Sequence, residues 1–278
     1  MDAAATPNSN KPRLLVFVLA YFAEATLRAV LERIPHSVFA DYDCEVLIVD
    51  DGSDDRTFQI GREYRSEHPE IRMTVLRNVY NQGYGGNQKI GYRFAIESGF
   101  HFVAMVHGDG QYAPEELPRL VAPLREDKAD AVFGSRMLVR GAALKGGMPL
   151  YKYVGNRILT RLQNLILGSE LSEFHSGYRI YSVGLLKRLP FDLNSNDFHF
   201  DTEIILQLFN ARARVLELPI PTRYGDEICR VEGMKYAKNV LAATLLNAVH
   251  RAGLLYHRRF DLQLTKHEAL RFQPPRPE

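Results

Sequence analysis

The sequence predicts an α/β fold built on a doubly wound parallel sheet. Five short segments rich in Val, Leu, Ile and Phe are spaced over residues 14–133, and amphipathic segments of helix length separate them. This alternation is typical of repeated strand–helix–strand units. Apolar residues make up 46% and charged residues 24% of the 278 residues, so the chain can bury a full globular core.

The predicted strands are expected to be buried on both faces, because their apolar residues follow one another without alternation. They cover Leu14–Ala20, Glu45–Val49, Arg72–Leu76, Phe102–Val106 and Ala131–Phe133. Helices are expected near Glu24–Arg33, Asp55–Glu67, Asn87–Ser98 and Pro114–Glu126. Pro114 and the two glutamates after it favour a helix start, since proline fits the first turn and acids stabilise the positive end of the helix dipole.

The second half of the chain has a less regular pattern. The Gly-rich residues 141–149 predict a mobile loop, and residues 175–179 interrupt the pattern. Helices are expected over Tyr151–Leu167, Thr202–Asn210 and Lys235–Ala252, and a strand over Arg214–Leu218. We expect a loose tail over residues 1–12, one domain over 13–252 and a basic, Pro-rich tail over 253–278.

Charge, cysteine content and hydropathy exclude several classes of protein. The 35 Lys and Arg against 33 Asp and Glu leave a net charge of +2, so no nucleic-acid partner is expected. Cys44 and Cys229 are too few for a disulfide framework, which fits a reduced, cytoplasmic setting. The longest apolar run, 14–23, is about half a membrane span. The first 11 residues lack the basic and apolar regions of a signal peptide.

Acids, glycines or charged residues follow the second to fifth predicted strands, at residues 50–55, 81–87, 107–111 and 134–136. Ligands of parallel α/β sheets bind beyond the carboxyl ends of the strands. The sequence therefore predicts a binding site at this edge of the sheet.

Residues 107–111 predict a metal site. Alternate residues of an extended segment point the same way, so Asp109 and Gln111 can offer two oxygens to one hard divalent cation, with His107 beside them. A histidine neighbour favours Mn²⁺ over Mg²⁺. The alternative is an acidic turn that leads into the helix at Pro114.

Asp50 and Asp51 can accept hydrogen bonds from a ribose or a base. The alternative is a turn in which Ser53 and Asp54 cap the next helix. Residues 83–86 (Gly-Tyr-Gly-Gly) predict a tight turn into a helix. They follow the third strand and lack both the third glycine of a dinucleotide fingerprint and the Lys-Ser/Thr of a Walker loop. That helix start can still lie near a nucleotide.

Four arginines are candidate phosphate ligands, since arginine binds phosphate oxygens bidentately; the alternative for each is a solvated surface group. They are Arg136, Arg179, Arg223 and Arg230. Tyr21 can stack on a base or lie in the core. Asp201 and Glu203 open a predicted helix, where acids complement the dipole.

In order and spacing, these motifs resemble those of the family 2 glycosyltransferases, in the polyprenyl-phosphate branch that contains dolichyl-phosphate mannose and glucose synthases. The resemblance covers about Leu14–Ala252. It rests on Ala20-Tyr21-x-x-Glu24, Val49-Asp50-Asp51-Gly52-Ser53, Asn81-x-Gly83-x-Gly85-Gly86, Gly134-Ser135-Arg136, Ser176-Gly177-Tyr178-Arg179 and Phe200-Asp201-Thr202-Glu203. Residues 107–111 align with the family's Asp-x-Asp-Gly-Gln metal motif, with His107 in place of the first aspartate.

The resemblance implies a glycosyltransferase A-type fold, a Rossmann-like, mostly parallel sheet with helices on both faces. It implies a nucleotide half over about 13–136 and an acceptor half over about 137–252. Nucleotide contacts are expected from Ala20, Tyr21, Glu24, Asp50, Asp51, Gly86 and Asp109. The metal would be held by His107, Asp109 and Gln111, and the acceptor phosphate by Arg136, Ser176, Arg179 and Arg223.

The implied reaction is an inverting transfer of a sugar from a nucleoside diphosphate sugar, with UDP ahead of GDP by family frequency. A divalent metal, Mn²⁺ or Mg²⁺, would neutralise the departing diphosphate at Asp109. The expected acceptor is a polyprenyl phosphate or a lipid-linked glycan. A phosphate acceptor is already ionised, whereas a hydroxyl acceptor needs a carboxylate base, with Asp201 and Glu173 as candidates.

Residues 212–259 carry nine Lys and Arg against four Asp and Glu. They predict either a solvated basic helix or peripheral contact with an anionic inner membrane face, at about 1 kcal/mol per basic residue. Two other functions stay open. The missing glycine in residues 20–24 argues against a sugar nucleotidyltransferase, and His107 favours a non-catalytic module that binds a nucleotide sugar or glycan.

Overall fold

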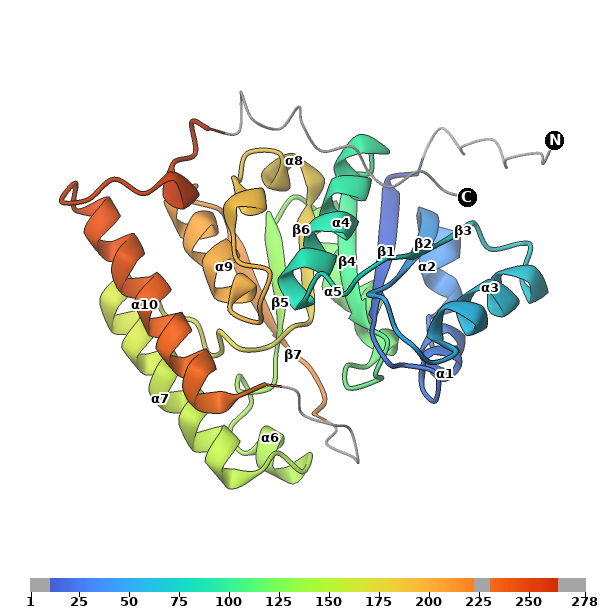
Figure 1. The fold of residues 1–278 in the computed structure, drawn as a ribbon, viewed down its shortest axis with the longest axis horizontal. Helices are drawn as coiled ribbons and strands as arrows, with labels where there is room; N and C mark the ends of the chain where they lie inside the picture. Colours follow the sequence, from blue (N-terminus) through green and yellow to red (C-terminus); the bar gives the residue numbers. More distant parts are fainter. Residues whose placement is uncertain (1–10, 223–230, 265–278) are drawn as a thin grey trace.

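The computed structural model describes residues 11–222 and 231–264 of the chain. Its centre is a seven-stranded sheet of order β3-β2-β1-β4-β6-β5-β7, in which β6 alone runs antiparallel to its neighbours (Figure 1). The strands are β1 (Arg13–Ala20), β2 (Asp43–Asp50), β3 (Met73–Arg77), β4 (Phe102–His107), β5 (Ala131–Ser135), β6 (Arg179–Ser182) and β7 (Val215–Pro219). The six predicted strands are confirmed to within about two residues, and the sheet is mostly parallel.

The sequence does not predict strand β6, which begins at Arg179, the last residue of the interruption at 175–179. One antiparallel strand agrees with the predicted mostly parallel sheet. Ile180 of β6 pairs with Ala104 of β4 and with Val132 of β5. Its side chain and that of Tyr181 point into the two opposite halves of the core. Four residues suffice for this strand because both of its edges are paired and both of its faces are buried.

Helices cover both faces of the sheet, as predicted. On one face pack α1 (Leu27–Glu32), α2 (His36–Asp41), α3 (Thr57–Glu67) and α5 (Leu117–Arg125), the last preceded by the 3₁₀ turn η1 (Pro114–Glu116). On the other face pack α4 (Tyr84–Glu97), α8 (Val183–Leu186) and α9 (Phe200–Asn210). Pro114 occupies the first turn of η1 with Glu115 and Glu116 after it, which confirms the predicted helix start.

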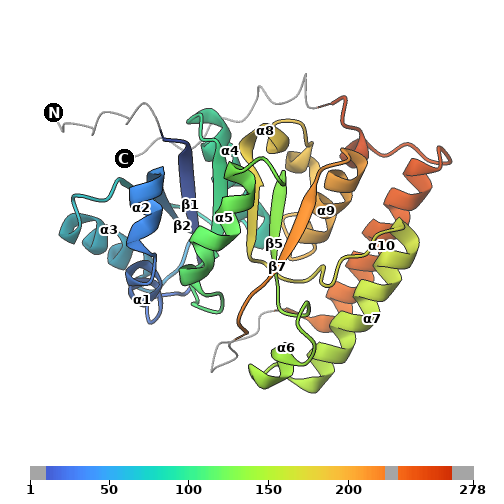
Figure 2. The ribbon, with the colours of Figure 1, turned by 180° about the vertical axis from the view of Figure 1, so that it is seen from behind.

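Two long helices, α7 (Leu150–Leu167) and α10 (Gly233–Arg251), pack side by side at the end of the molecule away from β3 (Figures 1 and 2). The short helix α6 (Ala142–Lys145) precedes α7, so residues 141–149 are not the plain loop that the sequence predicts. The glycines at 146 and 147 close this helix after one turn.

The packed fold extends beyond residue 252. The 3₁₀ turns η2 (Phe191–Leu193) and η3 (Arg258–Phe260) lie together, and Phe260 is buried in the core. Arg259 forms an ion pair with Glu203 of α9, so the predicted tail begins later than residue 253. Residues 1–10 and 265–278, together with Arg223, Cys229 and Arg230, lie outside the described residues.

Candidate active site

The carboxyl end of β2 forms a tight acidic turn. Asp50 is fully buried, and its Oδ1 accepts a hydrogen bond from the Ser53 backbone N–H at 3.1 Å. Asp51 Oδ1 accepts hydrogen bonds from Asn78 Nδ2 at 2.7 Å and the Gln82 backbone N–H at 2.8 Å. Burial raises the pKa of both carboxyls. The turn thus holds two adjacent buried carboxyl groups. Ser53 fixes that of Asp50, and Asn78 and Gln82 fix that of Asp51.

Gly52 lies between these aspartates with φ +73°, and a Cβ there would lie 3.1 Å from the backbone at Tyr80 and Asn81. Only glycine meets both conditions without strain. Ser53 does not cap the next helix, contrary to the alternative above: its hydroxyl accepts from the Phe22 backbone N–H at 2.8 Å, and α3 starts at Thr57.

The segment after β1 is tied to this turn. Ala20 is buried beside Asp50, and Tyr21 is half-buried with its ring edge-on to Phe22 at 4.6 Å. Glu24 is exposed, and its Oε2 accepts from the Arg56 backbone N–H at 2.8 Å. The predicted nucleotide contacts of Ala20, Tyr21, Glu24, Asp50 and Asp51 therefore come from one connected edge of the sheet.

The glycine-rich residues 83–86 form the start of α4, as predicted. The N–H groups of Gly85 and Gly86 both point to the Asn196 carbonyl, at 2.8 and 3.3 Å. A Cβ on Gly85 would lie 2.5 Å from the Ser195 carbonyl oxygen, so the glycines allow close packing against residues 195–200. Because its N–H is already bonded inside the protein, Gly86 packs against Asn196 rather than facing an open surface.

The turn after β4 carries the predicted metal ligands. Asp109 is exposed, and its Oδ1 accepts from the Gln111 backbone N–H at 2.9 Å. His107 faces inward instead: its Nε2 lies 3.4 Å from the Tyr84 hydroxyl, and a Cβ on Gly177 would lie 2.7 Å from it. Within residues 11–222 and 231–264, no three His, Cys, Asp or Glu side chains gather as a metal site.

The centre of the site is Asp201, in the first turn of α9. Its Oδ2 accepts from the Tyr84 hydroxyl at 2.9 Å and its Oδ1 from Gln88 Nε2 at 3.0 Å. Burial lowers the pKa of the adjacent His107, because it disfavours the charged imidazolium. The carboxylate of Asp201 is thus held by Tyr84 and Gln88 of α4, and the Arg179 guanidinium lies 3.8 Å from its Oδ2.

Arg179 is 1% exposed, and its guanidinium lies 3.8 Å from Asp201 Oδ2. Its guanidinium donates to the carbonyls of Phe174, Ser176 and Asp201 at 2.7 to 2.9 Å, and it lies over the Phe133 ring at 4.9 Å. Ser176 is also buried. These contacts make Arg179 an internal support for the segment that enters β6, and its predicted contact with an acceptor phosphate has no open face here.

Arg136 and Glu173 form a buried ion pair at the carboxyl end of β5. Glu173 also accepts from the Arg136 backbone N–H at 2.7 Å and from Asn156 Nδ2 of α7 at 2.8 Å. Burial alone would raise the pKa of Glu173, but the Arg136 charge and hydrogen bonds outweigh it and hold that pKa below its ordinary value. Glu173 is therefore an ionised carboxylate that is bonded to Arg136 and Asn156.

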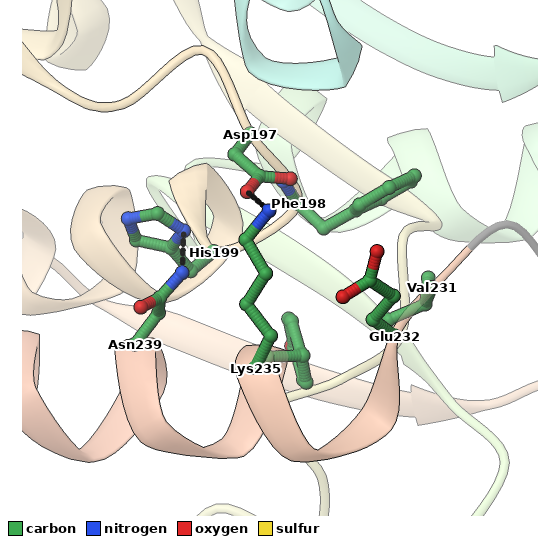
Figure 3. Close-up of a pocket in the computed structure, with 8 residues that line it drawn as sticks. Asp197, Phe198, His199, Val231, Glu232, Lys235 and Asn239 are labelled. Carbon is green, nitrogen blue, oxygen red and sulfur yellow. Dashed lines mark hydrogen bonds and ion pairs between the residues drawn. The ribbon is translucent and has the colours of Figure 1, made fainter.

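A small cavity of about 50 Å³ lies beside this centre, between α9 and α10 (Figure 3). Its lining residues are Asp197, Phe198, His199, Val231, Glu232, Lys235, Tyr236 and Asn239. The ring of Phe198 stacks on Tyr84 at 5.3 Å, and the Tyr236 hydroxyl lies 2.9 Å from His175 Nδ1. On one side of the cavity, Phe198 stacks on Tyr84, which is bonded to Asp201. On the other side, Tyr236 contacts His175, whose carbonyl accepts from Arg136.

The sequence analysis missed Tyr84, Gln88, Tyr112 and Tyr236, which bond the predicted residues together. One signal was available for the first two. Tyr84 and Gln88 are four residues apart, so they share a face of a helix and can reach one carboxylate once the predicted helix at Asn87–Ser98 is extended back to Tyr84. The tyrosines at 112 and 236 act across distant segments, which a sequence pattern does not join.

Comparison with known proteins gives the family of this chain. The family model described as glycosyl transferase family 2 matches residues 15–189, more than half of the chain. The chain belongs to glycosyl transferase family 2. This confirms the predicted family and the glycosyltransferase assignment, and it sets aside the nucleotidyltransferase and the non-catalytic module.

Curated relatives of this chain include enzymes named for polyprenyl-phosphate acceptors. The UDP-N-acetylglucosamine–dolichyl-phosphate N-acetylglucosaminyltransferase of Methanococcus voltae is 27% identical over 223 residues, which are 77% of this chain and 86% of that protein. The undecaprenyl-phosphate mannosyltransferase of Micrococcus luteus is 28% identical over 209 residues, 75% and 82% of the two chains. These names match the polyprenyl-phosphate branch of the family.

Solved structures confirm the fold. Glucosyl-3-phosphoglycerate synthase of Mycobacterium tuberculosis, in complex with Mn²⁺, UDP and glucosyl-3-phosphoglycerate, superposes with a TM-score of 0.60 over 86% of this chain and 81% of that one. The sequence identity is 18%, so the likeness concerns the fold. The same enzyme has also been solved with Mg²⁺ and UDP.

Proposed function

We propose that this glycosyltransferase moves a sugar from a nucleoside diphosphate sugar, UDP ahead of GDP, to a polyprenyl phosphate or a lipid-linked glycan, with inversion. The observation that carries the proposal is the sheet edge itself: the Asp50–Asp51 turn and the exposed Asp109 follow β2 and β4, and Asp201 of α9 reaches the same edge through its bond to Tyr84, which also contacts His107 at the end of β4. The names of the Methanococcus and Micrococcus relatives support the class of acceptor.

The residues present fit a divalent metal that binds together with the substrate phosphates. One exposed carboxylate, Asp109, with the amide of Gln111 nearby, matches Mg²⁺ or Mn²⁺, which commonly bind one or two carboxylates and complete their shell with water and substrate phosphates. The inward Nε2 of His107 makes it a support for Tyr84 more than a ligand. When bound, the metal supplies positive charge to the departing diphosphate.

The remaining chemistry is assigned to the chain's own side chains. We assign Asp50, Asp51, Tyr21 and Glu24 to the nucleoside, with Ala20 paired beside Asp50. Gly86 supports this edge from inside, where it packs against Gln82 and Asn196. Asp201 is the carboxylate that would take a proton from a hydroxyl acceptor, and a phosphate acceptor needs no base. Glu173 is then a positioning residue that orients Arg136.

The acceptor phosphate is assigned to the segment that Arg136 and Ser176 border, with Arg179 as an internal support and Arg223 as a further candidate outside the described residues. The cavity lined by Lys235 and Tyr236 adjoins this segment, because the Tyr236 hydroxyl lies 2.9 Å from His175 Nδ1 and the His175 carbonyl accepts from Arg136. Lys235 forms an ion pair with Asp197 at 4.0 Å, and an incoming phosphate can replace Asp197 as the partner of this lysine.

The proposed setting is cytoplasmic with peripheral contact at the inner membrane face, and without a nucleic-acid partner. In the two described stretches, 11–222 and 231–264, no helix has the length and apolar character needed to cross a bilayer.

Calorimetric binding of UDP and GDP, each with Mn²⁺, Mg²⁺ or EDTA, tests the donor side. We expect UDP to bind only when a metal is present. Transfer to a short, water-soluble prenyl phosphate, read as release of UDP from UDP-sugars, tests the acceptor side. Absence of nucleotide binding in every combination would overturn the proposal.

A further inference from the structure

Helix α7 presents polar side chains to the protein and apolar side chains to the solvent, the reverse of an ordinary surface helix. Asn156, Thr160 and Gln163 are buried. The outward face carries large apolar residues at helical spacing, which we call the outer stripe: Tyr151, Val154, Ile158, Leu162 and Leu165. Ile158 is 53% and Leu165 80% exposed. Single exposed apolar residues are common, but a continuous row of five marks a contact surface.

Hydrogen bonds fix the orientation of this helix. Asn156 donates to Glu173 at 2.8 Å, and Thr160 donates to Asn156 Oδ1 at 3.2 Å. Gln163 donates to Thr244 of α10 at 3.4 Å. Turning the outer stripe inward would bury apolar surface only by removing these bonds, so the folded chain keeps the stripe exposed.

The charge on the helix pair has one sign. Neither α7 nor α10 contains an aspartate or a glutamate, and each contains three Lys or Arg. The basic residues are Lys152, Arg157 and Arg161 on α7 and Lys235, Lys238 and Arg251 on α10. Arg161 is exposed at the edge of the outer stripe, three residues after Ile158 and four before Leu165.

This combination favours an anionic bilayer surface as the partner. Apolar residues flanked by Lys and Arg are typical of helices that lie in the membrane interface, where lipid headgroups attract the charge and the acyl boundary takes the apolar face. A second copy of the chain fits less well, since a two-fold contact through this face would set two acid-free, cationic helices against each other.

We propose that α7 lies on the anionic lipid surface through its outer stripe, with Arg161 on the headgroups. The inference rests on the proposed lipid-phosphate acceptor and names the surface that brings the site to it. Because Asn156 on the inner side of α7 binds Glu173, the membrane-facing helix and the Arg136–Glu173 pair are one hydrogen bond apart.

Flotation of the full chain with vesicles tests this. Vesicles of phosphatidylcholine and phosphatidylglycerol in equal parts should carry the protein, and pure phosphatidylcholine vesicles should carry much less. The double variant Ile158→Gln, Leu165→Gln should lower the vesicle-bound partition coefficient at least about tenfold. Arg161→Gln should lower it about fivefold.

Matched controls lie at the opposite end of the molecule. Arg65→Gln on α3 removes the same charge, and Val79→Gln, at a residue 82% exposed after β3, removes the same kind of apolar surface. Both should float like the unchanged chain. Equal flotation of the stripe variants and the unchanged chain, or a dimer in sedimentation that the stripe variants dissociate, would overturn the proposal.

Activity separates this inference from the proposed function. The Ile158→Gln, Leu165→Gln variant should keep transfer to a water-soluble short prenyl phosphate and lose most transfer to a long-chain prenyl phosphate in vesicles. Loss of neither would refute the membrane surface and leave the transferase proposal standing. Vesicle binding without any metal-dependent UDP binding would refute the transferase proposal instead.

Discussion

The Tyr84 hydroxyl donates a 2.9 Å hydrogen bond to Asp201 Oδ2, which joins the start of α4 to the start of α9 across 117 residues of chain. Gln88, one helical turn further along α4, donates to the other carboxylate oxygen at 3.0 Å. The orientation of this carboxylate is therefore set by a helix whose first turn also contacts the loop before α9 through Gly85 and Asn196.

Tyr84→Phe removes one of the two donors to Asp201. A hydrogen bond to a charged group contributes about 1.5–3 kcal/mol, so we expect kcat for a hydroxyl acceptor to fall at least about tenfold, with the affinity for UDP unchanged. Steady-state kinetics and calorimetry measure the two effects. Tyr64→Phe, at a buried tyrosine of α3, is the control and should leave both values unchanged. Unchanged kcat in Tyr84→Phe would refute the role of this pair.

Asp109→Ala removes the exposed carboxylate after β4. We expect metal-dependent UDP binding to disappear, because the remaining amide and imidazole carry no negative charge for a hard cation. Calorimetry with Mn²⁺ measures this directly. Asp41→Ala, which removes an exposed aspartate at the end of α2, should bind UDP like the unchanged chain. Retained binding in Asp109→Ala would take this residue out of the metal site.

Glu173→Ala leaves the Arg136 guanidinium buried without its carboxylate. Breaking a buried ion pair by removing one partner costs about 3–5 kcal/mol, and we expect the free energy of unfolding to fall by that amount in urea titrations. Glu67→Ala breaks the Arg28–Glu67 pair, both of whose side chains are over 40% exposed, and should change the stability very little. Similar effects of the two substitutions would contradict the buried pair.

His175 makes the fold sensitive to mild acid. Burial lowers its pKa to about 4, whereas an unfolded histidine has a pKa of about 6.5. The unfolded chain therefore binds a proton first, so this contribution to stability is complete above about pH 6.5 and is lost as the pH falls toward 4. The free energy of unfolding should fall more between pH 7 and 5 in the unchanged chain than in His175→Gln. Parallel pH dependences would contradict this.

Gly85→Ala tests the packing at the start of α4. Its Cβ would lie 2.5 Å from the Ser195 carbonyl oxygen and 2.6 Å from Phe200 Cβ, so we expect a loss of about 1–3 kcal/mol in the free energy of unfolding. Gly155→Ala in α7 meets nothing within 4 Å and should stabilise the protein by about 0.5–1 kcal/mol. Both follow from urea denaturation, and a tolerated Gly85→Ala would show that the 195–200 segment can move away.

The parallel part of the fold is predictable from sequence because each strand is a local apolar run. Strands β1 to β5 and the turns after them lie where hydrophobic segments and strand-end residues predict them. Strand β6 is not predictable in this way: its four residues follow a Ser-Gly pair and gain their stability from pairing with β4 and β5, which are distant in the chain.

The candidate site is predictable in its residues and less so in their partners. Asp50, Asp51, Asp109 and Asp201 all lie at the predicted edge of the sheet. Arg136 and Arg179 are charged groups that a sequence pattern assigns to phosphate, yet in the fold their guanidiniums bind Glu173 and backbone carbonyls. Such pairings depend on tertiary contacts that neither spacing nor composition reveals.

The polar inner row of α7 also governs what the chain does in water before it meets any partner. Rotating α7 to bury its leucines would remove the hydrogen bonds of Asn156, Thr160 and Gln163. Each polar group left unsatisfied would cost about 1–3 kcal/mol of folding free energy. The protein therefore cannot bury the outer stripe by rotating α7. Its self-association at high concentration should increase with salt and decrease with detergent. Salt screens the repulsion between the like charges of Arg157 and Arg161, and detergent covers the outer stripe.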